Sequence, residues 1–304
     1  MIPVPRSASA PWDAVLTGPE RSLVLYALVV AGLALLATFL RLWATRTTVG
    51  PKYRPASLAG VGVVAVAFTS YVLLAIEFLV GYDRSGSSWV PNDAAIWSWA
   101  PRYMDWSVSV PLLVVELLAV SALAGGLARR LRVVGVSAAF LMIALGYLGG
   151  VVVDGGHSFP ALLGYGLASS VFFVVLYIVV IVTVVRSLPL LPPVARSPYR
   201  AAMVLLLGVW FVYPIVFGLQ GFAHGGAWAV TGHLALAAAD VTAKTGYGLL
   251  IQKVALLRTA ADVTAGVDVQ PEAIWVDQQQ RSEAVAPPAA TGLADAAGAP
   301  GPDR

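Results

Sequence analysis

Two ionisable residues stand one helical turn apart in an apolar run late in the chain. The segment "ALAAADVTAKTGYGLL" places Asp240 four residues before Lys244, so both side chains would lie on one face of a helix. A buried lysine amine is suited to forming a Schiff base with a carbonyl compound. The pair therefore predicts a covalent carbonyl site with a carboxylate beside it.

A second set of polar residues occurs in the run "PRYMDWSVSVPLLVVELL". Arg102, Asp105, Ser109 and Glu116 would form one stripe of a helix at about 100° per residue. At about 1.5 Å per residue, Glu116 would lie roughly 16 Å along the helix from Asp105. The cations Arg102 and Lys244 could then form a neutral cluster with Asp105 and Asp240. A structural ion-pair network without chemistry is the alternative, although such pairs stabilise poorly compared with apolar packing.

Glu116 stands apart from these charges and has no obvious basic partner. In apolar surroundings a carboxyl group is expected to hold its proton. The alternative is an acid that is only hydrogen-bonded to a neighbouring carbonyl or hydroxyl group. Glu77 is a sixth ionisable residue, near the end of another apolar run.

The composition explains why these charges matter. Of the 304 residues, 59% are hydrophobic and 12% are charged, whereas soluble domains have about 45–50% and about 25%. This predicts an integral membrane protein, in which buried charge is costly and usually marks function. The absence of cysteine excludes disulfides and thiol chemistry. No metal site and no nucleic-acid partner is predicted.

Seven apolar runs reach the length of about 20 residues that a bilayer-spanning helix needs. We therefore predict an all-α, seven-helix transmembrane bundle over 21–260, in the cell membrane. A loose segment, 1–20, would precede it, and the Pro- and Ala-rich 261–304 would form a disordered tail. The expected spans are 22–45, 57–80, 98–124, 133–153, 160–186, 200–220 and 227–256.

Lysine and arginine predict the orientation of these spans. The links between spans 1 and 2, 3 and 4, and 5 and 6 are rich in them, whereas the opposite links hold only Arg84. Because positively charged links stay in the cytoplasm, the N-terminus is expected outside and the C-terminus inside. The residues in the three basic links are Arg46, Lys52, Arg54, Arg129, Arg130, Arg132, Arg186, Arg196 and Arg200.

Four motifs, in order and on the expected helices, resemble the microbial (type 1) rhodopsins, and among them the bacteriorhodopsin and proteorhodopsin pumps. They are "RYMDWSVSVPLL" on helix 3, "GYLGG" at 146–150, "WFVYP" at 210–214 and "DVTAKTGYGL" on helix 7. The resemblance covers roughly 22–258. It implies all-trans retinal carried by Lys244 as a protonated Schiff base.

The resemblance also implies roles for individual residues. Asp105 would be the primary counterion and proton acceptor, Asp240 the second counterion, and Arg102 a shuttle toward the exit. Leucine at 113 suggests green absorption. The residues expected around retinal are Tyr103, Trp106, Leu113, Met142, Gly146, Trp210, Tyr213, Pro214 and Phe217.

The spacing of the helix 3 carboxyl groups predicts a direction of transport. A buried cation needs an adjacent anion, and Asp105 would be the base on the outer side. A reprotonating acid must then come from the other side, where Glu116 stands. We therefore predict a light-driven outward proton pump. Its proton acceptor would be Asp105, its hydroxyl relay Ser109 and its proton donor Glu116.

Several positions depart from the family pattern. Ser109 replaces a usual threonine, and Ser70 occupies the position where proteorhodopsins have a histidine. No carboxylate lies in the 6–7 link, so Glu77, Asp83 and Asp154 are weak candidates for proton release. The histidines 157, 224 and 233 are expected in loops or interfaces. Some relatives bind a carotenoid antenna beside a glycine on helix 5, but Gly164 and Gly166 leave that alignment open, so the sequence does not support one.

Other functions remain open. A sensory photoreceptor is the main alternative; Glu116 counts against it and the long tail mildly for it. A light-gated channel or another ion selectivity is a third, although Asp105 disfavours chloride pumping. An enzyme has no support. Besides the lipid bilayer and protons, the expected partner is a second copy of the chain, in a trimer or pentamer.

Overall fold

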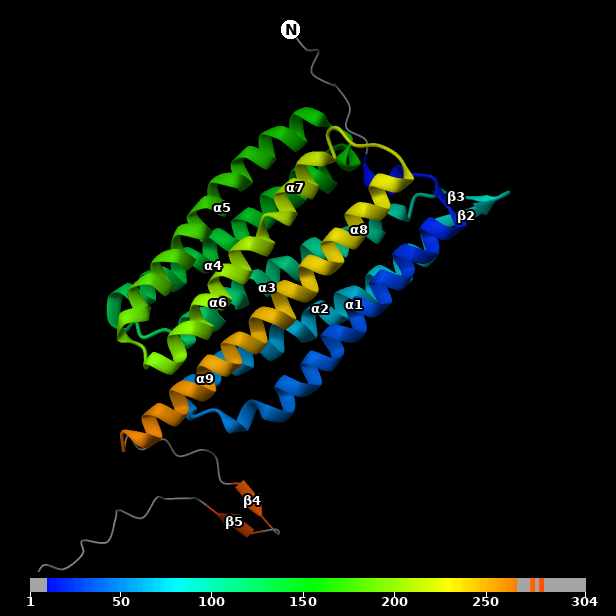
Figure 1. Cartoon of the computed structure of the whole chain (residues 1–304). Coiled ribbons are helices and arrows are strands. Elements are labelled where there is room, and N and C mark those ends of the chain that lie inside the picture. Colours follow the sequence, from blue (N-terminus) through cyan, green and yellow to red (C-terminus); the bar gives the residue numbers. More distant parts are fainter. Residues whose placement is uncertain (1–9, 267–273, 277–278, 282–304) are drawn as a thin grey trace, which may run out of the picture.

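The computed structural model describes residues 10–266, 274–276 and 279–281. Within them, seven helical spans lie side by side as an elongated bundle (Figure 1). Spans 6 and 7 are each divided into two helices. The helices are α1 (Gly18–Thr45), α2 (Arg54–Val80), α3 (Ala100–Ala119), α4 (Gly125–Tyr147), α5 (Phe159–Ser187), α6 (Pro193–Trp210), α7 (Val212–Leu219), α8 (Gly226–Val241) and α9 (Tyr247–Thr264).

Neighbours in sequence are mostly neighbours in space. Helix α1 packs on α2, α2 on α3, α3 on α4, and α4 on α5. Helix α6 packs on α9, and α8 packs back on α1, which closes the bundle. The interior between α2, α3 and α8 therefore holds side chains that are far apart in the sequence.

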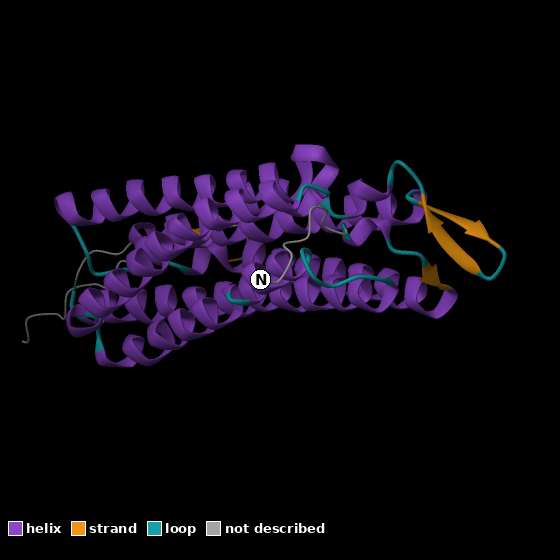
Figure 2. Ribbon diagram, turned by 90° about the horizontal axis from the view of Figure 1, so that it is seen from above, coloured by secondary structure: helices purple, strands orange, loops and turns teal. Residues whose placement is uncertain are grey.

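A small antiparallel sheet marks one end of the bundle (Figure 2). Its strands are β1 (Leu16–Thr17), β2 (Tyr82–Ser85) and β3 (Ser88–Pro91), in the order β1-β3-β2. Arginine 21 lies over the Trp89 ring at 3.8 Å. We call this the hairpin end, and the opposite end, where α9 stops at Thr264, the tail end. Strands β4 (Ile274–Val276) and β5 (Gln279–Arg281) pair with each other beyond it.

Local chemistry explains where several helices begin and break. At the start of α1, the Thr17 side chain accepts from the Glu20 amide, and the Thr17 amide donates to the Glu20 carboxylate at 2.8 Å, which is a capping box. Pro214 has no N–H to donate to the Trp210 carbonyl, and the sixth span divides between α6 and α7 there. At the tail end, Arg258 donates to the carbonyls of Val120 and Ser121 just beyond α3.

The predicted seven-helix bundle is confirmed, but four helix boundaries were wrong, one of them the end of α3, which stops at Ala119 instead of near 124. Helix α4 begins at Gly125 instead of near 133, α6 at Pro193 instead of near 200, and α9 runs to Thr264 instead of 256. Arginines 129, 130 and 132 therefore lie on a helix and not in a link. A helix can continue past the apolar length that a bilayer demands, because its backbone hydrogen bonds are made within itself.

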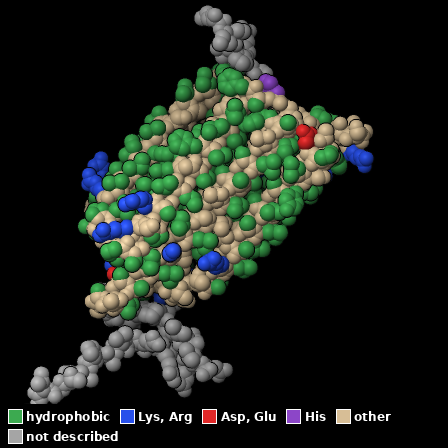
Figure 3. Space-filling view, viewed as in Figure 1, with side chains coloured by type: hydrophobic (Ala, Val, Ile, Leu, Met, Phe, Trp, Pro, Cys, Tyr) green, Lys and Arg blue, Asp and Glu red, His purple; other side chains and the backbone are tan. Residues whose placement is uncertain are grey.

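The face of the bundle seen in Figure 3 is largely apolar between its two ends. Large exposed side chains such as Leu33, Leu58, Leu167 and Val204 are distributed over α1, α2, α5 and α6. Six of the described spans are long and apolar enough to cross a membrane. Helix α3 is the exception by composition, because its 20 residues include Arg102, Asp105 and Glu116. Lysine and arginine gather near the tail end (Figure 3).

The two predicted terminal segments are only partly visible. Of the expected loose segment 1–20, residues 10–17 are described, with Trp12 buried, and α1 already begins at Gly18. Most of the expected disordered tail after residue 260 lies outside the described residues.

Candidate functional site

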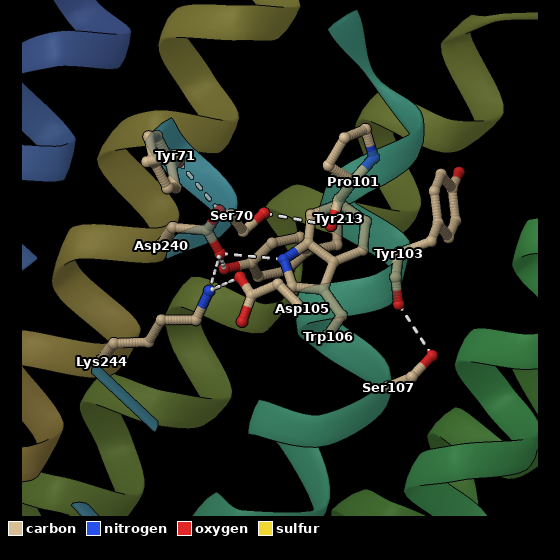
Figure 4. A network of polar contacts seen from close by, with 10 residues as sticks. All are labelled: Ser70, Tyr71, Pro101, Tyr103, Asp105, Trp106, Ser107, Tyr213, Asp240 and Lys244. Atoms are coloured by element: carbon tan, nitrogen blue, oxygen red, sulfur yellow. Dashed lines mark hydrogen bonds and ion pairs between the residues drawn. The ribbon is translucent and has the colours of Figure 1, made fainter. Parts of the chain in front are cut away.

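The amine of Lys244 lies at the centre of the bundle between two carboxylates (Figure 4). Its Nζ is 2.5 Å from Asp105 Oδ2 and 2.9 Å from Asp240 Oδ1. All three side chains are at most 2% exposed. Lys244 sits in a π-helical turn, Thr242–Gly246, between α8 and α9. Such turns interrupt α-helices mostly at functional sites.

Asp240 is held by donors from three other helices (Figure 4). Tyr71 on α2 donates to Oδ2 at 2.9 Å, while Trp106 on α3 and Tyr213 on α7 donate to Oδ1 at 3.0 and 2.9 Å. With Lys244, four donors converge on one carboxylate. We call these five residues together with Asp105 the Lys244 cluster. A buried carboxylate with this many donors is stabilised as the anion.

Asp105 is bonded much less completely. Its Oδ2 accepts from Lys244, whereas its buried Oδ1 has no hydrogen-bond partner among the described residues. The hydroxyl of Ser109, one helical turn further toward the tail end, is likewise buried and makes no hydrogen bond of ordinary length among the described residues, although it lies close enough to the Asp105 carboxyl group to interact with it. Buried polar atoms are almost always hydrogen-bonded. These two unsatisfied oxygens therefore mark a place where a proton or a water can be accepted.

Arg102 does not join the ion pairs of the Lys244 cluster. Within the described part of the chain it has no carboxylate within ion-pair distance. Its guanidinium donates to the Ser98 carbonyl at 3.2 Å, approaches His233 Nδ1 at 3.1 Å and lies 5.1 Å from the centre of the Trp99 ring. The suggested four-residue neutral cluster is therefore divided into a bonded set of three and a separate arginine.

A pocket opens beside Lys244 between α3, α4, α5, α7 and α8, with about 1000 Å³ of empty space, part of it open to the surroundings. Ligand pockets usually have largely apolar walls with a few placed polar groups. The nine residues expected around retinal all line it: Tyr103, Trp106, Leu113, Met142, Gly146, Trp210, Tyr213, Pro214 and Phe217. Gly166 also lines it, whereas Gly164 does not.

The pocket suits an apolar carbonyl compound attached at Lys244. The Lys244 side chain is in the pocket wall, and aromatic rings surround it, with Trp106 and Tyr213 packed edge to face at 5.0 Å. The nearest carboxylates are within bonding distance of Nζ, so a cation at that nitrogen would be paired. The charged partners of Nζ and the aromatic lining therefore agree with a covalently bound apolar chromophore.

Glu116 occupies a separate site in the tail half of the bundle. It is 2% exposed, and its Oε2 is buried with no hydrogen-bond partner among the described residues. A Cβ added to Gly60 on α2 would come within 2.9 Å of Glu116 Oε1, and one added to Gly248 on α9 within 3.7 Å. Two glycines thus make room for the carboxyl group, and Leu42 closes the site from α1.

Polar residues reappear one helical turn further toward the tail end. Ser57 on α2 donates to Gln252 Oε1 on α9 at 2.8 Å, and both are buried. The Gln252 amide reaches the Thr45 carbonyl at the end of α1 at 3.5 Å. This bridge lies between Glu116 and the tail-end surface.

Sequence reasoning missed two residues of the site. Tyr71 had no signal beyond being an aromatic residue in an apolar run. His233 was expected in a loop or interface, but it lies on α8 and is 1% exposed. Its spacing of seven residues from Asp240 puts it on the same helix face and was the available signal.

The sequence profile of the bacteriorhodopsin-like protein family matches residues 21–257. Because this is most of the chain, the protein belongs to that family and is a type 1 rhodopsin. It is therefore a multi-pass membrane protein rather than an enzyme, and the family implies a retinal chromophore.

Individual relatives differ in what they do. The chain is 27% identical to bacteriorhodopsin-I of Haloarcula marismortui over 70% of this chain and 82% of that one. It is also 27% identical to sensory rhodopsin-2 of Haloarcula vallismortis, over 67% and 79%. The structure of xanthorhodopsin, a light-driven ion pump with a dual chromophore, matches 82% of this chain and 98% of that one, with 26% identity and a TM-score of 0.73. Light-driven pumps and sensors are both represented.

Proposed function

We propose that the protein is a light-driven outward proton pump, with all-trans retinal attached to Lys244, Asp105 as the proton acceptor and Glu116 as the proton donor. The observation that carries the proposal is the contrast among three buried carboxyl groups. Among the described residues, Asp240 has four donors, whereas one buried oxygen of Asp105 and the Oε2 of Glu116 have no hydrogen-bond partner.

Retinal bound at Lys244 would supply light absorption and a light-dependent change at the nitrogen that carries the proton. The Lys244 cluster would supply the rest. Asp240 keeps its negative charge because its four donors stabilise the anion. Asp105 is the carboxylate in contact with Nζ that still has an acceptor free, so it takes the proton at Oδ1.

Glu116 would return a proton to the Lys244 nitrogen from the other side. A carboxyl group buried without a charge partner is favoured in its neutral form, because an unpaired buried charge is costly. Glu116 therefore holds a proton at rest. Ser109 lies between the two carboxyl groups on α3, and its buried hydroxyl is close to Asp105.

The direction of transport follows from the orientation that we propose. Most of the basic residues that predict this orientation lie on the first or last turns of α2, α4, α5 and α6 beside the 1–2, 3–4 and 5–6 connections, at the same end of the bundle as the end of α9. The tail end is then cytoplasmic and the hairpin end outside. Asp105 is on the hairpin side of Glu116 along α3, so protons enter from the cytoplasm and leave outside.

The test is to express the chain in bacterial cells with all-trans retinal and to record the pH of an unbuffered suspension under green light. Acidification that a protonophore abolishes is expected. Alkalinisation, or a light response that persists with the protonophore, would contradict outward proton pumping.

The donor role has its own test. In Glu116→Gln the amide cannot carry the proton, so reprotonation of the Lys244 nitrogen should slow by roughly 100-fold or more. The visible spectrum in the dark should be unchanged, since Glu116 does not line the pocket. A photocycle with unaltered reprotonation would remove the donor role while leaving the acceptor role of Asp105 intact.

A sensory photoreceptor is the second candidate, because a sensory rhodopsin is as similar to the chain as a bacteriorhodopsin, at 27% identity. Coloured cells that show no change in pH under light would favour it.

A further inference from the structure

The proposed cycle leaves one buried titratable side chain without a role. His233 on α8 is 1% exposed and lies between the rings of Trp99, at 4.2 Å, and Phe78, at 5.5 Å. It stands seven residues before Asp240, so it is roughly 10 Å nearer to the hairpin end at about 1.5 Å per residue. A polar ring in such surroundings calls for an explanation.

The contact with Arg102 fixes how the ring must carry its hydrogen. Arg102 Nη2 lies 3.1 Å from His233 Nδ1. A guanidinium can only donate hydrogen bonds, so Nδ1 must be the acceptor and the ring must be neutral with its hydrogen on Nε2. That Nε2 is buried and has no partner among the described residues. The one basic nitrogen of His233 is therefore occupied as long as Arg102 stays in place.

The pair stands on the exit side of Asp105. Arg102 precedes Asp105 by three residues on α3, again toward the hairpin end. The carboxylates considered for release from the sequence, Glu77, Asp83 and Asp154, make no hydrogen bond to Arg102 among the described contacts. Tyr82 is a further buried titratable group; its ring packs on Phe78 at 5.1 Å, the same phenyl ring that His233 contacts.

We propose that His233 is the proton relay between Asp105 and the hairpin-end surface, and that Arg102 closes this relay at rest by occupying Nδ1. The proposal rests on the proposed pumping function and adds the exit route to it. It also sets an order of events: no proton can pass to His233 before the guanidinium leaves Nδ1.

The proton balance of the relay is simple. When Arg102 withdraws from Nδ1, the ring accepts the proton that Asp105 gives up and becomes an imidazolium. The imidazolium then loses the proton on Nδ1 toward the hairpin end and is neutral again, with its hydrogen still on Nε2. Renewed donation from Arg102 to Nδ1 leaves the remaining hydrogen on Nε2, as at rest. One proton enters from Asp105 and one leaves, with no net change in His233.

The resting state can be tested without any measurement of transport. The chain has three histidines, so ¹⁵N-histidine labelling of the retinal-bound protein gives few signals, and His233→Asn identifies one of them. In the dark, the His233 Nδ1 signal is expected to be that of a non-protonated, hydrogen-bonded nitrogen, with the proton on Nε2. A proton on Nδ1, or on both nitrogens, at neutral pH would overturn the proposal.

The relay itself is tested by His233→Asn, because an asparagine oxygen can still accept from Arg102 but cannot carry a proton. Proton appearance in the medium, followed with a pH-sensitive dye after a flash, should slow by roughly 100-fold. His224→Asn, at an exposed position in the link between α7 and α8, is the matched control and should behave as the parent. Unaltered release in His233→Asn would overturn the relay and leave only a role in holding Arg102.

Proton uptake by Asp105 and proton release to the medium can be measured separately, so the relay and the pump are tested independently. If Asp105 still takes up the proton after the flash and release is normal in His233→Asn, only the relay is wrong. If Asp105 takes up no proton in the parent protein, the pump itself is wrong. Should His233→Asn form no pigment, His233→Gln and the ¹⁵N measurement on the parent decide the question.

Discussion

Asp240 and Glu116 are both buried carboxyl groups in the middle of the bundle, but their surroundings are opposite. Asp240 accepts from Tyr71, Trp106, Tyr213 and Lys244. Glu116 has a buried oxygen with no partner and is bordered by two glycines and a leucine. Four hydrogen-bond donors therefore surround the Asp240 carboxylate, whereas the Oε2 of Glu116 has none among the described residues.

The difference indicates which group keeps a charge and which group moves a proton. A carboxylate with several donors is a fixed anion, because each donor would be left unsatisfied if the charge were lost. A buried carboxyl group without donors keeps its proton, because its anion would be unpaired, and it can give the proton up only to a group that has itself just lost one. Asp105, with one bonded and one free oxygen, lies between these extremes.

The largest effect is expected when the cation of the Lys244 cluster is removed. In Lys244→Ala no coloured pigment should form on adding retinal, since the attachment nitrogen is lost and two carboxylates remain without their cation. Lys253→Ala, at an exposed position on α9, is the control and should give normal colour. A stable coloured pigment in Lys244→Ala, read from the visible spectrum, would show that the attachment site is elsewhere.

The next test disturbs the space around Glu116 without changing the acid. In Gly60→Ala the new methyl group would lie 2.9 Å from Oε1, so the carboxyl group must shift. Reprotonation after a flash should slow by about tenfold to 100-fold, because displacement of a reacting group by about 1 Å can cost roughly 100-fold.

Gly208→Ala on α6 is the control for that change, because an added Cβ meets nothing within 4 Å there. Its photocycle should match that of the parent. If Gly60→Ala also cycled normally, the clearance beside Glu116 would have no part in the donor step.

A smaller effect is expected when one donor to Asp240 is removed. Tyr71→Phe should lower the free energy of unfolding by about 1.5–3 kcal/mol, the usual contribution of a hydrogen bond to a charged group. Tyr199→Phe removes a bond to the Leu117 carbonyl at 3.1 Å, and should cost only about 0.5–1.5 kcal/mol. Reversible unfolding in mixed micelles measures both, and equal losses would argue against a charged Asp240.

The smallest effect concerns an exposed carboxylate at the hairpin end. Asp13 Oδ2 lies 2.7 Å from His157 Nε2, and both side chains are 44% exposed. Partial burial lowers the pKa of His157, but the hydrogen bonds to the Asp154 carbonyl and to Asp13, together with their charges, raise it overall. A folded-state pKa above the unfolded value of about 6.5 means that folding takes up a proton.

This contact should therefore stabilise the protein fully below about pH 6.5 and progressively less as the pH rises through the raised pKa of His157. The thermal midpoint should decline slightly over that window in the parent protein. Asp13→Asn should flatten the decline. A midpoint that instead rises with pH across the window, and equally in both proteins, would show that the pair contributes nothing.

Much of the fold could be predicted because it depends on local sequence. The length and apolar content of seven runs define the spans, and the spacing of Asp240 and Lys244 puts them on one helix face. The extent of α4, α6 and α9 could not be read in this way, since polar residues such as Arg129 and Arg130 continue a helix as readily as they end it. The sheet at the hairpin end was also missed, because its strands have only two to four residues each.

The sequence by itself determined the class of protein, the family, the lysine and the helix 3 stripe, because these follow from composition, motif and helical periodicity. Only the tertiary structure decided which partners these residues have. Tyr71 and Tyr213 reach Asp240 from other helices, Gly60 and Gly248 face Glu116, and Arg102 pairs with His233 instead of a carboxylate. Such contacts join residues more than 100 positions apart in most cases, and the packing of helices across the bundle, which brings them together, is not encoded in any one segment.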